Sequence, residues 1–323
     1  MAELVRHFPG YDAPAVRRIF QRSGVERRHF AIGPGGFDPK ADADQMLALY
    51  GETAPRLSIE VARRAIERAR ASLDEIGLVV VATCTGYICP GLTAHVVRGL
   101  KLPEDVQRAD LVGMGCAGAL PALQRGVDYV LGHSGKKALV VCVEVCSACW
   151  YVDESVETLV GNAICADGGA AVVLDTNGQD GPRICDFATG VDTEWMSSVG
   201  LVTKAGRHRI ILSKGLRKAA GPVSKRVIQR LLDRHGIARG DVRHWVFHAG
   251  GRAVLDSIET AMELPAEALA TSREILRNYG NMSSPTVLFV LDAFRQRAPS
   301  PGDIGVALAL GPGLAAEAAL LRW

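Results

Sequence analysis

Short, β-branched apolar runs alternate along the chain with longer stretches whose apolar residues recur at helical spacing. The run GLVVVAT (77–83) follows a helical pattern over 57–72, and KALVVCVEV (137–145) follows helical residues that extend to about 132. Short, uninterrupted runs of this kind are typical of strands that are buried on both faces. Repeated strand–helix alternation predicts an α/β protein in which helices cover mixed sheets.

A polar, glycine-rich segment near the middle of the chain, TNGQDGPR (176–183), is predicted to separate two parts. We expect an N-terminal part over residues 1–176 and a C-terminal part over 177–323. In each part a glycine-rich turn leads into a long helix, GMGCAGALPALQ in the first and YGNMSSPTVLFVLDAF in the second. With 323 residues, 48% of them hydrophobic, the chain is long enough to form two packed halves.

Charge and composition argue against several functional classes. The 37 basic and 35 acidic residues give a net charge of +2, so neither nucleic acid nor an anionic membrane is expected as a partner. The start of the chain has no apolar signal-peptide core, and no run approaches about eighteen apolar residues, so no membrane span is expected. Cys142, Cys146 and Cys165 lie in apolar or Gly/Ala-rich runs typical of buried free thiols, which predicts a cytoplasmic location.

Cys116 is the first candidate for a catalytic residue. It lies between small residues, in GMGCAG, where a strand-like run ends and a helical pattern begins. A cysteine at a helix N-terminus is expected to have a stabilised thiolate, and nearby backbone N–H groups can hold an oxyanion. The alternative is a small buried cysteine that only fills space, and the spacing alone does not decide between the two.

His248 and Asn281 are the other two candidates, and each has a structural alternative. His248 ends an apolar run and precedes two glycines, so it can exchange a proton with a thiol, or it can be a core histidine. Asn281, in NYGNMSS, can donate its amide to an oxyanion or enolate, or it can belong to a turn or cap. None of the three residue types is acidic, so none would repel the anions of such a reaction.

Taken together, several segments resemble one family. GMGCAGAL, VFHAGGRAVLD, ILRNYGNMSSPTVLFVLD and GVALALGPGLAAEAALL are similar, in order and separation, to segments of the chalcone-synthase-like type III polyketide synthases, and CTGYICPG and VGNAICADGGAAVVL extend the match. The resemblance covers the chain from about residue 20 to its end.

The resemblance implies a thiolase-like fold with two related halves in a five-layered α/β/α/β/α arrangement, and a homodimer. It places a catalytic centre on Cys116, His248 and Asn281. The substrates would be malonyl-CoA and an acyl-CoA or acyl-carrier-protein starter, joined by decarboxylative condensation into a pyrone, resorcinol or related polyketide, with no cofactor and no metal. The residues implied in substrate binding are Cys149, Cys165, Ser283, Cys89, Gly311, Pro312 and Gly313.

The sequence departs from the family pattern around the expected cavity. Cys165 replaces a gatekeeper phenylalanine, and Cys146 and Cys149 stand where plant members often have threonines. Cys89 aligns with a residue that reaches across the dimer in plant members. Residues 309–313 have the sequence ALGPG, where the family usually has Gly-Phe-Gly-Pro-Gly. These changes predict a starter that is not a phenylpropanoid, such as a long acyl chain.

The N-terminal region departs as well, because we expect the family's first strand, which would precede FQRSGVERRHF, to be missing. Arg17, Arg18 and Arg22 lie near the position at which the family binds CoA phosphates, although Ser23 replaces one usual lysine. A solvated helix face is an equally good interpretation of these arginines.

Three other functions compete with this one. Cys142, Cys146 and Cys149 have the C-x₃-C-x₂-C spacing of the iron–sulfur site in radical-SAM enzymes, but Cys142 and Cys146 fall in a strand-like run. A single-round enzyme like the β-ketoacyl-carrier-protein synthases III uses the same three catalytic residue types. A non-catalytic partner with this fold is disfavoured, because all three residues are present.

Overall fold

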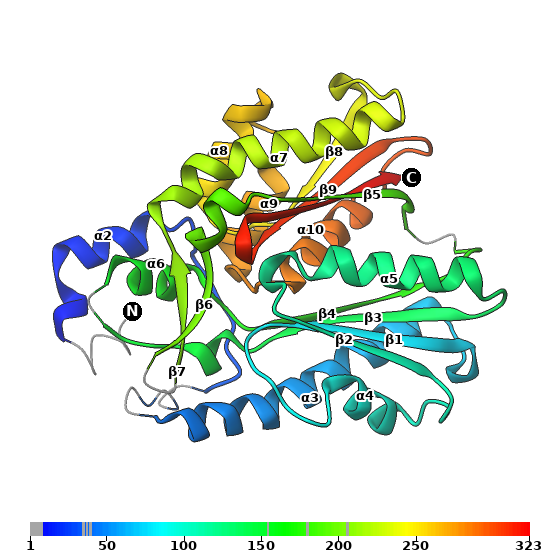
Figure 1. Ribbon diagram of the computed structural model, residues 1–323, viewed down its shortest axis with the longest axis horizontal. Helices are drawn as coiled ribbons and strands as arrows, with labels where there is room; N and C mark the ends of the chain where they lie inside the picture. The colour runs from blue at the N-terminus through cyan, green and yellow to red at the C-terminus, as the bar shows by residue number, and fades with distance from the viewer. Residues whose placement is uncertain are drawn as a thin grey trace.

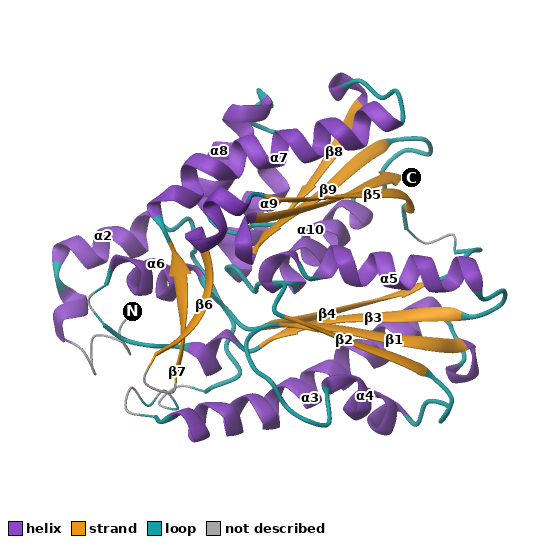
Figure 2. Ribbon diagram, viewed as in Figure 1, coloured by secondary structure: helices purple, strands orange, loops and turns teal. Residues whose placement is uncertain are grey.

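The computed structural model describes residues 9–323 apart from residues 34–35, 37, 39–40, 154, 179–180 and 205–206. Two four-stranded sheets lie one above the other, with helices between them and on both outer faces (Figure 1). The arrangement of helices and strands is clearest in Figure 2.

The first sheet has the order β2-β1-β3-β4. Its strands are β1 (Ile76–Thr83), β2 (Gln107–Val112), β3 (Lys137–Glu144) and β4 (Gly168–Leu174). β1 runs parallel to β2 and β3, whereas β4 is antiparallel to β3. Alternate residues of β1 enter different cores, since Val80 packs with the central helices and Val79 packs with the outer ones. This explains why the strand sequence is apolar without interruption.

The second sheet has the order β5-β10-β9-β8. Its strands are β5 (Arg183–Val191), β8 (Val242–Phe247), β9 (Ile304–Gly311) and β10 (Ala315–Arg322), and β6 (Val199–Lys204) and β7 (Arg207–Leu212) form a separate hairpin. β8 and β9 are parallel, and β10 is antiparallel to both of its neighbours.

Helices complete five layers. α3 (Ala43–Ala69) and α4 (Leu92–Leu100) cover the first sheet, α5 (Ala119–Gly132) and α10 (Pro285–Gln296) lie between the sheets, and α7 (Lys214–Arg234) and α8 (Arg252–Met262) cover the second (Figure 1). α9 (Ala270–Tyr279) packs beside α10, and α2 (Pro14–Arg22) and α6 (Val156–Ile164) lie together at one end. The short 3-10 turns are η1 (Pro9–Asp12), η2 (Leu73–Glu75), η3 (Gly115–Ala117), η4 (Cys146–Cys149), η5 (Thr193–Ser198), η6 (Arg239–Asp241) and η7 (Pro312–Leu314).

The two sheets have the same internal order. β1, β3 and β4 correspond to β8, β9 and β10, since each set contains a parallel pair followed by an antiparallel strand. β5 pairs with the free edge of β10, but among the described residues no strand pairs with the corresponding edge of β4. The sequence predicted that the family's first strand is missing before residue 20, and residues 1–8 lie outside the described part of the chain.

Several elements differ from the sequence prediction. α3 begins well before the expected residue 57, because Asp42 caps it and exchanges hydrogen bonds with Gln45. β2 ends at Val112 rather than running to Gly115. The pattern did not predict the β6–β7 hairpin, α6, α9, β5 or β10, whose apolar periodicity is short or is interrupted by charged residues.

Candidate active site

Cys116 lies on η3, between the end of β2 and the start of α5. The backbone before it turns sharply, with φ of +86° at Gly113 and +52° at Gly115, values that favour glycine. Gly115 is also in close contact with its surroundings, since a Cβ there would lie 2.5 Å from Cδ of Pro312. The local sequence therefore presents the cysteine on a tight turn just ahead of a central helix.

A turn of the C-terminal half packs against this loop. A Cβ at Gly311 would lie 2.6 Å from both the Ala117 Cβ and the Met114 carbonyl oxygen. Gly313, two residues later, has φ of +75° and open space around it. The predicted Gly311–Pro312–Gly313 segment thus supports the cysteine loop directly, rather than only lining a cavity.

Asn281 faces Cys116 with its amide held in one orientation. Its Oδ1 accepts a hydrogen bond from the Ser283 backbone N–H at 2.8 Å, and its Nδ2 donates to the Gly250 carbonyl at 3.1 Å. The Cys116 Sγ lies 3.9 Å from Oδ1 and 4.0 Å from Nδ2. One N–H of the amide remains for a ligand, because the other is used by Gly250.

His248 follows β8 and extends its pairing, since its N–H donates to the Leu308 carbonyl at 2.8 Å. Its side chain is buried, and neither ring nitrogen has a hydrogen-bond partner among the described residues. The ring lies over Gly250, where a Cβ would be 3.1 Å from Nε2. Gly250 therefore connects His248 with Asn281. A buried imidazole without partners is costly unless a substrate supplies one.

Burial controls the protonation of this centre. Desolvation raises the pKa of Cys116 to about 12, although a hydrogen bond from Ser283 opposes the shift, and desolvation lowers the pKa of His248 to about 4. The sequence led us to expect a thiolate stabilised by the helix dipole, and burial opposes that ionisation. We therefore expect the thiol to lose its proton as it attacks.

A carboxyl group that the sequence interpretation missed lies behind the cysteine. Glu144, at the end of β3, is fully buried, and its Oε2 accepts hydrogen bonds from the Cys84 and Thr85 backbone N–H groups at 2.9 and 3.1 Å. Its Oε1 accepts from Ser284 Oγ at 2.8 Å, which connects the two halves. Burial raises the pKa of Glu144 in spite of these bonds. The available signal was one acidic residue in an otherwise apolar strand.

The predicted substrate-binding residues divide into those near the centre and one that is not. Cys165 forms an isolated bridge with Asn281, and Ser283 Oγ lies 3.4 Å from the Cys84 thiol, which also borders the centre. Cys149 donates to the Thr85 carbonyl at 3.0 Å and lines a neighbouring pocket of about 160 Å³. Cys89, in contrast, is exposed on the loop between β1 and α4.

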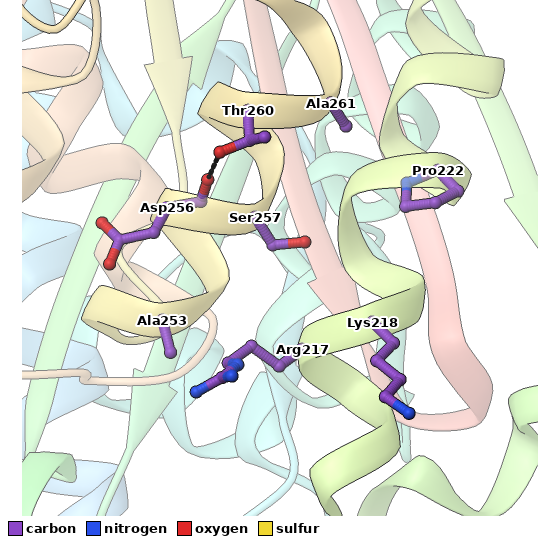
Figure 3. Close-up of a pocket in the computed structure, with 8 residues that line it drawn as sticks. All are labelled: Arg217, Lys218, Pro222, Ala253, Asp256, Ser257, Thr260 and Ala261. Atoms are coloured by element: carbon purple, nitrogen blue, oxygen red, sulfur yellow. Dashed lines mark hydrogen bonds between the residues drawn. The ribbon is translucent and has the colours of Figure 1, made fainter.

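Other features lie outside this centre. A groove of about 420 Å³ between α7 and α8 is lined by Arg217, Lys218 and Asp256, among others, and none of its lining residues belongs to the centre (Figure 3). The arginines of α2 are exposed, and Arg17 pairs with Asp12, as expected for a solvated face.

The alternative cluster cysteines do not converge. Cys142 lies in the core between the sheets, whereas Cys146 lies in a separate cluster near β7. Across the described ranges, no group of three or more metal-ligating side chains is present. No helix in the same ranges is long and apolar enough to cross a bilayer.

Two related sheets, with a cysteine ahead of one central helix and an asparagine ahead of the other, define a thiolase-like condensing enzyme. Comparison with known proteins identifies the family. A family model for FAE1/type III polyketide synthase-like proteins matches residues 1–234, and a model for the C-terminal domain of chalcone and stilbene synthases matches residues 209–323. The chain belongs to the type III polyketide synthases, which are acyltransferases.

Individual relatives agree over nearly the whole chain. A 3,5-dihydroxyphenylacetyl-CoA synthase of Amycolatopsis balhimycina is 31% identical over 97% of this chain and 86% of its own. A 1,3,6,8-tetrahydroxynaphthalene synthase of Streptomyces peucetius subsp. caesius is 32% identical, covering 98% and 85%. The crystal structure of PKS-I from the brown alga Ectocarpus siliculosus has a TM-score of 0.92 at 31% identity, covering 99% and 92%. The thiolase-like α/β prediction is therefore confirmed, and the ketoacyl-synthase alternative is not favoured.

Proposed function

We propose that this enzyme condenses malonyl-CoA repeatedly onto an acyl thioester starter and releases a pyrone, a resorcinol or a related polyketide. The observation that carries the proposal is the fixed Asn281 amide, whose Nδ2 lies 4.0 Å from the Cys116 sulfur and donates to the Gly250 carbonyl. The His248 ring lies over the same Gly250, and neither of its nitrogens has a partner among the described residues. A nucleophile and two neutral hydrogen-bonding groups in one buried space suit a reaction that passes through oxyanions.

The proposed sequence of steps uses each group in turn. Cys116 attacks the starter thioester, His248 takes the thiol proton, and the carrier thiolate leaves with a proton. Malonyl thioester then loses CO₂, and its enolate oxygen accepts hydrogen bonds from the free N–H of Asn281 and from His248. The carbanion attacks the acyl-Cys116 carbon, which lengthens the chain by two carbons and releases the cysteine.

Glu144 does not contradict this chemistry. Its oxygens are directed toward the backbone of Cys84 and Thr85 and the Ser284 hydroxyl, rather than toward the Cys116 sulfur. Burial favours its neutral form, so the repulsion of an enolate is reduced.

The pocket beside Cys149 supports an acyl starter. Its lining includes the side chains of Met46, Leu47, Ala148 and Trp150, together with Thr85, the residue that follows Cys84. A Met46→Trp variant should fill this pocket and lower the rate with long acyl starters, while short starters are still accepted. Ala48→Trp, an exposed position on the same helix, is the matched control. Equal rates for all chain lengths in both variants would contradict this assignment.

We also infer a homodimer located in the cytoplasm, with the starter delivered by CoA or by a carrier protein. The outer edge of β2 supports the dimer, because this strand lies at the end of its sheet and Val112 is 48% exposed. All eight cysteines are free thiols in the structure, as is typical of a reducing compartment.

The decisive experiment is a mass-spectrometric product assay. Purified enzyme receives malonyl-CoA with acyl-CoA starters of several lengths, next to Cys116→Ala and the remote control Cys185→Ala. Products extended by two or more malonyl units, absent only with Cys116→Ala, would support the proposal. Products with a single extension would instead assign the enzyme to the ketoacyl-synthase class. Full activity of Cys116→Ala would refute the assigned nucleophile.

A further inference from the structure

Two cysteines that the proposed reaction does not use lie in the segments that follow β3 and precede β4. The last pair of this antiparallel ladder is Glu144 with Gly168, so the next residues of one segment face the preceding residues of the other. Cys146 begins the 3-10 turn η4, two residues after this pair, and Cys165 caps the end of α6, three residues before it. The turn and the helix end, rather than the ladder, therefore position the two side chains.

Hydrogen bonds hold the two segments together beyond the ladder. The Ser147 backbone N–H donates to Oδ1 of Asp167 at 2.7 Å, and the Ser147 hydroxyl donates to Oδ2 at 2.6 Å. Both cysteines belong to one buried cluster, in which Cys146 is 7% exposed and Cys165 is 8% exposed. The two thiols are therefore neighbours in a segment that is fixed on both sides.

The environment makes the two thiols unequal. The Cys146 thiol and the positive charge of Arg28 lower the pKa of Cys165, against the effect of its burial. Its partner has the opposite shift, since the interaction with Cys165 and burial raise the pKa of Cys146. Arg28 is fixed nearby, because its Nη1 donates to the Cys165 carbonyl at 3.0 Å. Cys165 therefore loses its proton more easily than Cys146, so a peroxide oxidises Cys165 first and Cys146 can then attack it.

The pair is also connected to the catalytic centre. The Asn281 N–H donates to the Ile164 carbonyl at 2.7 Å, and the Ala166 N–H donates to the Asn281 carbonyl at 2.9 Å. Cys165 lies between these two attachment points. A change in its position therefore reaches the residue that faces Cys116.

We propose that Cys146 and Cys165 are a redox-active pair, which hydrogen peroxide converts to a reversible disulfide. The Cys165 thiolate attacks the peroxide, so that an S–O bond forms, the O–O bond breaks, and hydroxide leaves. Cys146 then attacks the sulfenic sulfur, so that the S–S bond forms and water leaves with the Cys146 proton. The two sulfurs lose two electrons and the peroxide gains them. A dithiol reverses the reaction.

The disulfide is expected to lower turnover by displacing the backbone that holds Asn281. A displacement of about 1 Å at a catalytic group can reduce turnover by about 100-fold. This effect on turnover rests on the proposed function, whereas formation of the disulfide does not.

Peptide mass spectrometry tests the disulfide without any turnover. Protein with Cys116→Ala, which removes the nucleophile as a competing target, is treated with hydrogen peroxide, blocked with a maleimide and digested. A linked Cys146–Cys165 peptide that dithiothreitol separates is the expected result. It should be lost with Cys165→Ser and retained with Cys142→Ser, a cysteine of β3 that lies in a different core.

Three results would overturn the proposal. These are unlinked thiols under peroxide, a linkage of Cys165 to another cysteine, and oxidation of Cys165 beyond sulfenic acid without linkage. In a second measurement, the wild-type enzyme and Cys146→Ser are compared, each relative to its own untreated rate. Dithiothreitol should restore part of the activity lost under peroxide in the wild type, but not in Cys146→Ser. Equal recovery in both would show that the disulfide does not control turnover, even if the linked peptide forms.

Discussion

Two glycines of one turn should have different functions, although they are only two residues apart. Gly311 is pressed against the cysteine loop, with a hypothetical Cβ 2.6 Å from both the Ala117 Cβ and the Met114 carbonyl oxygen. Gly313 has open space around it and only a positive φ, of +75°. Gly311→Ala therefore changes a contact with the cysteine loop, and Gly313→Ala changes only the backbone energy.

The expected magnitudes follow from these distances. Carbon atoms pack at about 3.5–4.0 Å, so the new methyl group must displace the cysteine loop by roughly 1 Å. Overpacking of this kind costs about 1–3 kcal/mol, and the misplaced nucleophile should lower kcat by up to about 100-fold. Gly313→Ala should cost about 1–2 kcal/mol through its left-handed backbone, with kcat within about threefold of wild type.

The assay combines denaturant unfolding, kcat and the rate at which iodoacetamide alkylates Cys116. Gly311→Ala should lower the free energy of unfolding, kcat and the alkylation rate of Cys116. Gly313→Ala should lower only the free energy of unfolding. Adding Ala117→Gly to Gly311→Ala removes one of the two clashes and should restore part of the activity, giving a measurable coupling between the sites. The reasoning would be refuted if Gly311→Ala kept wild-type alkylation and turnover, or if both glycine variants lost activity equally.

Three further predictions concern the buried polar groups. The free energy of unfolding of the wild type should fall by about 2–3 kcal/mol between pH 7 and 4.5, because the unfolded histidine gains a proton near pH 6.5 whereas the buried one resists until about pH 4. His248→Gln should remove this loss of stability. Asn281→Ala should lower kcat by about 10²–10³-fold, the usual effect of removing an oxyanion donor, and should leave Cys116 able to accept an acyl group. Ser284→Ala should reduce the free energy of unfolding by about 1–3 kcal/mol, since Glu144 Oε1 loses its hydroxyl partner.

Each of these has a clear contrary result. Parallel unfolding free energies of wild type and His248→Gln across the acid range would show that His248 is not buried in its neutral form. Unchanged kcat in Asn281→Ala would remove the amide from the mechanism. Wild-type stability of Ser284→Ala, with Ser283→Ala equally stable, would show that Glu144 finds another partner.

Local patterns in the sequence were sufficient for much of this structure. The apolar runs of β1, β3 and β9 predicted buried strands, because a strand covered on both faces has no polar positions. The glycines around Cys116 and Asn281 marked turns ahead of central helices, because only residues without a Cβ fit such close approaches. The order of the signature segments then indicated the family.

Tertiary structure decided what depends on neighbours distant in the sequence. Whether Cys116 is a thiolate depends on the competition between helix dipole and burial, and burial depends on how the two halves close around it. Contact between Gly311 and Ala117, the Glu144–Ser284 hydrogen bond, and the packing of Cys146 and Cys165 in one buried cluster each join segments whose positions no local pattern encodes. The sequence determined which groups are available, and packing determined which of them meet and which protonation state they hold, because both distance and solvation are properties of the folded chain.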